Sequence, residues 1–125
     1  MKQQKKTKKL PSIPRKISVV GDLFPIEPLT QDKLAEYGIT DAPVDTALGL
    51  CNQLKGVILL RPGMGLSRTQ STLLHEILHV IVGHSCLGLK AEKEEQVVTL
   101  ISQMLYETFK TNKNLLEFLG AKGDD

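Results

Sequence analysis

The chain has 125 residues, of which 41% are hydrophobic, which is enough for one compact domain with its own core and too few for two domains. No apolar run approaches the roughly 20 residues of a membrane helix, and two cysteines are too few for a disulfide framework. Because tryptophan is absent and aromatic residues make up only 4%, the core is expected to consist mainly of Leu, Ile and Val.

Charge is distributed unevenly along the chain. Residues 1–16 carry seven of the sixteen basic side chains and no acidic one, which leaves nine basic and fourteen acidic residues in the rest. We therefore expect a disordered basic tail over 1–16, a single domain over 17–120 and a polar tail over 121–125. The basic tail is interpreted as a solubilising segment, with contact to nucleic acid as the alternative.

The start of the chain also bears on its compartment. No apolar segment follows the basic residues as it does in a secretory signal, so we expect a cytoplasmic protein. Cys51 and Cys86 are accordingly expected to be reduced. Cys86 is interpreted as a small core residue, with a position near a metal as the alternative.

The stretch "KISVVGDLFPIEPLT" contains two apolar runs on either side of Gly21 and Asp22. This pattern is typical of a β-hairpin, and a glycine at the first turn position favours a type II′ turn. Pro25 and Pro28 lack the backbone N–H, which restricts the second strand to the edge of a sheet or shortens it.

The next segments predict a short helix over 31–38, which ends at Gly38, and a loop over 39–45. Residues 46–60 again form two apolar runs around a polar turn. The second of these runs, 57–60, is expected to be the most buried strand. The first half of the chain therefore predicts a small antiparallel sheet.

The second half of the chain predicts helices. Ser67 and Gln70 match a capping box that opens a helix, and 73–82 is apolar at almost every position, as in a helix buried on all sides. A second long helix is expected over 90–110 and a short one over 113–119, which packs its leucines and Phe118 inward.

The stretch "TLLHEILHVI" places His75, Glu76 and His79 in an HExxH motif on the first long helix. Two histidines four residues apart lie on one face of a helix, where both imidazoles can bind one zinc ion. Glu76 lies about 100° around the helix, within reach of a metal-bound water but outside the coordination shell. Because buried His and Glu side chains are costly without partners, this pattern predicts a zinc site with Glu76 as general base.

A third protein ligand is needed to complete such a site. His84 is excluded because nine residues of helix turn it about 900°, to the side opposite His75. The candidates are Glu92, Glu94 and Glu95, since an antiparallel helix after a short turn would bring its first turns beside His79.

The motif helix, the strands before it and the later stretch "EEQVVTLISQMLYETF" resemble the short ImmA/IrrE-type metallopeptidases, many of which are phage or prophage proteins. The resemblance covers about residues 17–112. It implies an α+β fold of the minimal zincin, gluzincin-like type, with a small antiparallel sheet on a buried HExxH helix and a second long helix. It also implies Zn²⁺ as cofactor, Glu95 as third ligand with Glu94 as runner-up, and a regulatory protein as substrate.

The functional hypothesis is a zinc-dependent metallo-endopeptidase that hydrolyses a protein substrate, bound as a strand added to the sheet. Arg61 is interpreted as a solvated charge, with substrate contact as the alternative, and Tyr106 is given no catalytic role. The alternative function is a catalytically silent, zinc-stabilised phage accessory module that binds a protein or nucleic acid through its basic N-terminal arm.

Overall fold

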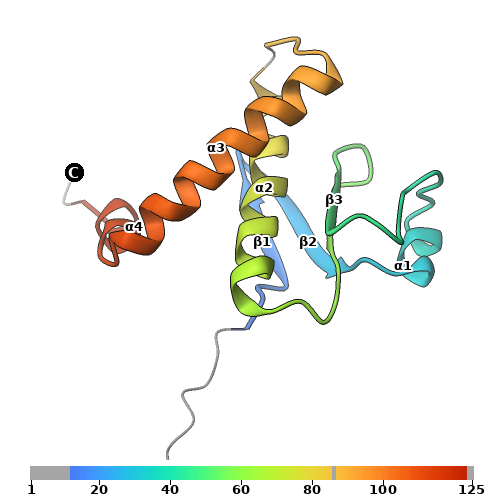
Figure 1. Cartoon of the computed structure of the whole chain (residues 1–125), viewed down its shortest axis with the longest axis horizontal. Coiled ribbons are helices and arrows are strands. Elements are labelled where there is room, and N and C mark those ends of the chain that lie inside the picture. Colours follow the sequence, from blue (N-terminus) through green and yellow to red (C-terminus); the bar gives the residue numbers. More distant parts are fainter. Residues whose placement is uncertain (1–11, 86, 124–125) are drawn as a thin grey trace, which may run out of the picture.

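The computed structural model of the chain describes residues 12–85 and 87–123. These residues form an α+β fold in which a four-stranded sheet packs against helices (Figure 1). The elements are β1 (Lys16–Val19), β2 (Asp22–Pro28), α1 (Gln31–Glu36), β3 (Gly49–Asn52), β4 (Val57–Leu60), α2 (Leu66–His84), α3 (Ala91–Thr111) and α4 (Leu115–Leu119).

The strand order in the sheet is β1-β2-β4-β3, and the sheet is mixed. Both hairpins are antiparallel as expected, but β2 and β4 run parallel, with Ile26 opposite Ile58. The prediction of a purely antiparallel sheet was therefore wrong. The chain between the two hairpins places Gly49, where β3 begins, at the end of the sheet at which β2 ends, so β3 runs antiparallel to β2. β4 reverses direction again and lies between these two strands, which makes it parallel to β2.

The position of β2 also differs from the expectation for a strand with two prolines. β2 is internal because its two halves pair with different neighbours. Residues Asp22 to Pro25 pair with β1, and Ile26 to Pro28 pair with β4. Pro25 thus stands where the strand changes partner, and the next residue, Ile26, donates its N–H to the carbonyl of Arg15 at 2.8 Å.

The turn between β1 and β2 consists of Val20 and Gly21, because Val19 pairs with Asp22. Both turn residues have positive φ, 50° and 86°, as in a type I′ turn. The predicted type II′ turn at Gly21 and Asp22 was therefore placed one residue too late. A β-branched residue such as Val20 rarely adopts this backbone conformation, which is why the sequence did not indicate it.

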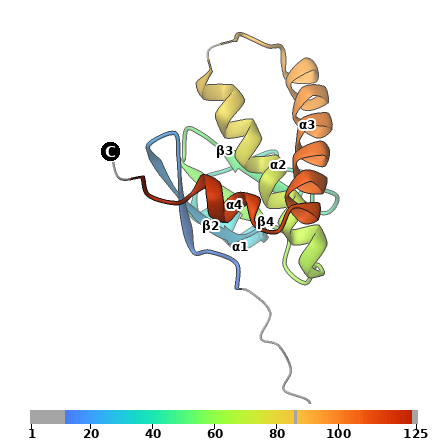
Figure 2. The same cartoon turned by 90° about the vertical axis from the view of Figure 1, so that its left-hand side faces the viewer.

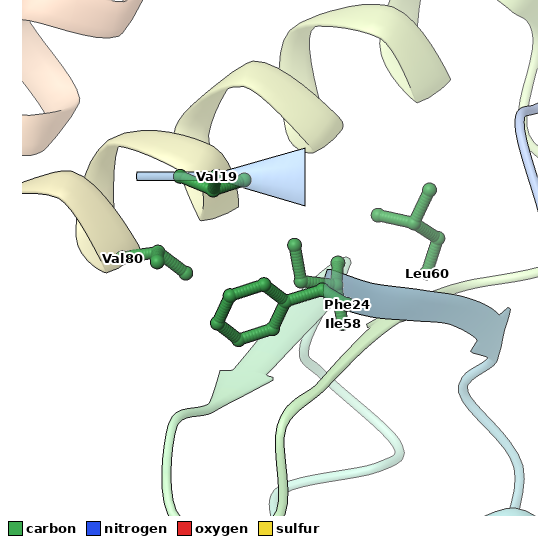
Figure 3. Close-up of a cluster of buried hydrophobic side chains, with 5 residues drawn as sticks. All are labelled: Val19, Phe24, Ile58, Leu60 and Val80. Carbon is green, nitrogen blue, oxygen red and sulfur yellow. The ribbon is translucent and has the colours of Figure 1, made fainter. Parts of the chain in front are cut away.

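The core is built on both faces of β4, which is buried at all four positions, as predicted. Because side chains alternate along a strand, Ile58 and Leu60 face α2 while Val57 and Leu59 face α1 and the loop after it. Figure 3 shows the first of these clusters, in which Val80 of α2 contacts the sheet. Its buried members are Val19, Phe24, Ile58, Leu60 and Val80.

The opposite face of the sheet is covered by α1 and the following loop. α1 begins after Thr30, whose hydroxyl accepts a hydrogen bond from Lys33 N at 3.2 Å, and ends before Gly38, which has a φ of 67°. Arg61 ties the loop down by donating from Nε to Ala47 O at 2.8 Å and from its terminal nitrogen to Val44 O at 2.7 Å. Arg61 therefore has a structural role, where the sequence indicated a solvated charge.

α2 begins at Leu66, earlier than a capping box at Ser67 would place it. Gly65 is the N-cap residue, and no side chain caps the helix, so that prediction was wrong. The helix is also not buried on all sides, since Ile81 is exposed. Its buried positions form one stripe of helical spacing against the sheet: Thr69, Thr72, Glu76 and Val80.

α3 matches the predicted second long helix and packs against α2, which it crosses at an angle (Figures 1 and 2). Its buried positions are Val98 and Ser102. The short helix α4 was expected to pack its apolar side chains inward, but Leu116, Phe118 and Leu119 are exposed. Its five residues make little more than one turn, and α4 projects beyond the sheet and α2 (Figure 1).

The described residues include the last part of the segment expected to be a tail. β1 starts at Lys16, one residue before the predicted domain boundary. Most of the basic arm, Cys86 and the last two residues lie outside the described residues, and so do the hypotheses attached to them. None of the described helices combines the length and the apolar character needed to cross a membrane.

Candidate metal centre

The HExxH histidines and one glutamate of α3 come together at the contact between the two long helices. His75 and His79 lie one turn apart on α2, with their ring centroids 4.9 Å apart. Glu95 on α3 reaches both of them, with Oε1 3.1 Å from His75 Nε2 and Oε2 2.7 Å from His79 Nε2. One carboxylate therefore bridges both imidazoles.

This arrangement can hold a metal ion. One ligand atom each of His75, His79 and Glu95 lies within 4.8 Å of the others. Three atoms that bind a cation in tetrahedral geometry at ~2.0–2.1 Å are separated by about 3.4 Å, so small side-chain rotations would complete the set. Burial lowers the pKa of His75, which favours the neutral imidazole that binds metals, although the charge of Glu95 opposes this shift.

Of the three glutamates proposed from the sequence, Glu95 is the one in the cluster. Glu94 has a different place, with its Oε2 3.1 Å from Nδ1 of His79. His79 is thus held from both sides, by Glu94 at Nδ1 and by Glu95 at Nε2. A carboxylate at Nδ1 accepts the N–H and leaves the Nε2 lone pair for a cation. Glu92 is exposed and belongs to neither contact.

His75 also has a neighbour at its second nitrogen, because the hydroxyl of Ser102 lies 3.5 Å from Nδ1. Ser102 is one of the two buried residues of α3 and donates its hydroxyl hydrogen bond to Thr99 O at 3.1 Å. α3 therefore supplies Glu95 and a polar neighbour for each histidine. Neither Glu94 nor Ser102 could be given these roles from spacing alone.

Glu76 lies on the stripe of α2 that faces the sheet and is only 6% exposed. Burial raises the pKa of its carboxyl to about 7, while the charge of His79 lowers it and that of Glu95 raises it. Room for this side chain is provided by Gly49 on β3, where a Cβ would lie 3.3 Å from Glu76 Cγ and 2.7 Å from Thr72 Cγ2. A glycine at the start of a strand is the feature of the sequence that could have indicated this close approach.

Cys51 is a second neighbour of Glu76 that sequence reasoning missed. Its thiol hydrogen-bonds the Glu76 carboxyl, and this bond opposes the effect of burial on the pKa of Glu76. Burial and the charges of Glu76 and Glu94 raise the pKa of Cys51 to about 12, so that it stays a neutral thiol. It was Cys86, not Cys51, that the sequence suggested near the metal.

Two hollows lie on either side of the cluster. The larger, of about 540 Å³, is lined among others by Ala47, Gly49, His75 and Ser102. The smaller, of about 310 Å³, is lined by residues that include Gln53, Cys51 and His79. Both share Gly49, Glu76 and Glu95, so the two hollows adjoin each other between β3 and the long helices, and together they are called the groove along β3. β3 is an edge strand, paired only with β4 among the described strands.

His84 and Tyr106 lie away from the cluster, as expected. His84 ends α2, with Nδ1 2.9 Å from Val80 O and Nε2 2.9 Å from Oδ2 of Asp22. Tyr106 donates its hydroxyl to Gln70 Oε1 at 3.0 Å and so joins the two long helices.

Comparison with family models, with curated proteins and with solved structures finds no match for this chain.

Proposed function

We propose that this protein is a zinc-dependent metallo-endopeptidase that hydrolyses a peptide bond in a protein substrate. The observation that carries the proposal is the convergence of His75, His79 and Glu95 on one point, with Glu76 buried beside them and outside the ligand set. This is the division of roles that an HExxH hydrolase requires. The proposed fold type is accordingly the minimal, gluzincin-like zincin.

The donor set fits Zn²⁺. Two imidazoles and one carboxylate are the protein ligands of one class of catalytic zinc site, which keeps its fourth position open. A structural zinc site would use four protein ligands, commonly with cysteine, whereas Cys51 here contacts Glu76 and carries a raised pKa. When bound, Zn²⁺ would lower the pKa of a water and polarise the substrate carbonyl.

Glu76 is the proposed general base. A pKa of about 7 suits a carboxyl that takes a proton from the attacking water and returns it to the leaving amine at neutral pH. The Gly49 contact and the Cys51 thiol hold this carboxyl in place between the sheet and the histidines.

The substrate is proposed to lie in the groove along β3 as an extended chain. The outer edge of β3 faces no other described strand, and an extended peptide can add to such an edge through main-chain hydrogen bonds. This orientation passes the peptide over His75, Glu76 and Glu95, which line the same groove. The resemblance to ImmA/IrrE-type enzymes favours a regulatory protein of a phage or its host as the substrate.

The first experiment measures zinc per chain by elemental analysis, on protein purified without chelators or a histidine tag. We expect about one zinc ion in wild type, none in His79→Ala and Glu95→Gln, and retention in Glu94→Gln with affinity lowered by roughly 10–100-fold. A folded wild type that takes up no added Zn²⁺ would refute the proposal. Loss of zinc from Glu94→Gln but not from Glu95→Gln would show that Glu94 is the third ligand and that Glu95 is not.

The second experiment tests catalysis with a library of unstructured peptides and with Glu76→Gln as the matched variant. Zinc should remain bound in Glu76→Gln while hydrolysis falls by at least 100-fold, since the base is removed and the ligands are not. Zinc binding without hydrolysis in wild type would instead support the zinc-stabilised binding module.

A further inference from the structure

The side of α3 that faces away from α2 carries a second apolar stripe. At about 100° per residue, Val97, Met104 and Leu100 lie roughly 100–160° around the helix from the buried residue Val98, all in the same direction. Lys93 precedes this stripe and Glu107 follows it, so that successive members, from Lys93 to Glu107, are four, three, four and three residues apart. This is the spacing of a seam between two packed helices.

The stripe is exposed to an extent that is unusual for a monomer surface. Leu100 is 61% exposed and Met104 64%, and Ile101 beside them is 41% exposed. They form one contiguous apolar face on α3, and an exposed apolar face of this kind marks an interaction surface.

The charges at the two ends of the stripe identify its partner. Lys93 and Glu107 lie seven residues before and seven residues after Leu100, and neither forms an ion pair with a described residue of its own chain. A stripe with a basic residue at one end and an acidic residue at the other is complementary to itself when reversed.

We propose that α3 pairs antiparallel with α3 of a second copy of this chain, around a two-fold axis next to Leu100. Each Lys93 then lies beside Glu107 of the second copy, twice per dimer, and Val97 lies beside Met104 of the second copy. Glu95 is on the other side of α3, toward His75, so the groove along β3 stays open in the dimer. The inference is independent of the proposed enzymatic activity.

The test is sedimentation velocity on the full chain from about 1 to 500 μM, with charge-reversed variants. We expect wild type to dimerise reversibly, and Lys93→Glu or Glu107→Lys to weaken dimerisation by roughly tenfold, because two attractive pairs become repulsive. The double variant Lys93→Glu/Glu107→Lys should recover the wild-type constant. Met104→Lys, in the middle of the stripe, should be monomeric.

Glu92→Lys is the matched control, because it makes the same charge change on the same helix about 80° from Leu100 and about 60° from Glu107, beside the stripe and not in it. It should dimerise like wild type, and circular dichroism should show that all variants are folded. A wild type that is monomeric at 500 μM would overturn the proposal, and the partner of the stripe would then be a different protein. Dimerisation that the double variant fails to recover would equally overturn the two-fold arrangement.

Discussion

Gly49→Ala tests how closely β3 approaches α2 beside the candidate metal centre. The added Cβ would lie 2.7 Å from Thr72 Cγ2 and 3.3 Å from both Glu76 Cγ and Leu59 O. Overpacking of this kind costs about 1–3 kcal/mol. The backbone of Gly49 is ordinary extended chain, so alanine would otherwise gain about 0.4–1 kcal/mol by restricting the unfolded state. The net expectation is a free energy of unfolding lower by about 1–2 kcal/mol and a Tm lower by roughly 4–8 °C.

A double-mutant cycle with Thr72→Ser identifies the cause, since serine lacks the methyl group that the new Cβ meets. In equilibrium denaturant unfolding, Gly49→Ala should be close to neutral in the Thr72→Ser background, which gives a coupling energy of about 1–2 kcal/mol. If the two substitutions add without coupling, the approach of β3 to α2 is looser than the structure indicates and the reasoning about Glu76 loses its basis.

Three further predictions concern contacts away from the cluster. Asp22 hydrogen-bonds His84 and thereby raises its pKa, with the Val80 carbonyl as a second cause. Wild type should therefore have a higher free energy of unfolding than Asp22→Asn. This difference should be largest below about pH 6.5 and should disappear as the pH rises through the raised pKa of His84, as unfolding curves from pH 5.5 to 9 should show. If the difference grows with pH, this linkage is wrong. Arg61→Met removes both hydrogen bonds to the loop after α1, so limited proteolysis should cut that loop several-fold faster, and an unchanged rate would contradict the structural role. Ile58→Ala, at a position with no exposed surface, should lower the free energy of unfolding by about 2–5 kcal/mol, while Leu54→Ala, at 98% exposure, should stay within about 0.5 kcal/mol. Equal effects in thermal unfolding would refute the assignment of the core.

The cluster of His75, His79 and Glu95 could be predicted because it depends on local geometry. Two residues four apart on a helix share a face whatever surrounds them, so His75 and His79 needed no tertiary information. To predict Glu95 it was also necessary to assume that the second long helix runs antiparallel to α2. The short connection after α2 made this the simplest arrangement. The resemblance to a known family then separated Glu95 from Glu94.

The parts that could not be predicted depend on contacts between distant segments. Which strands neighbour β4 is decided by how the second hairpin docks on the first, with β4 beside β2 and β3 outside, and apolar alternation does not encode that choice. The neighbours of Glu76 could not be predicted for the same reason, because they come from a distant segment of the chain. Gly49 and Cys51 lie about 25 residues before it and become its neighbours only through the pairing of β3 with β4.

The attachment of α3 has a consequence for how the protein would take up an ion. α3 packs mainly against α2 and buries only Val98 and Ser102, yet it contributes Glu95 to the cluster. Without an ion, α3 should therefore detach in a local opening reaction at a much lower free energy than global unfolding. An ion bound between the helices would oppose that opening, so hydrogen exchange along α3 should slow as Zn²⁺ is added, while exchange in β4 should remain governed by global unfolding. In this way occupancy of the centre and docking of the second helix become one equilibrium.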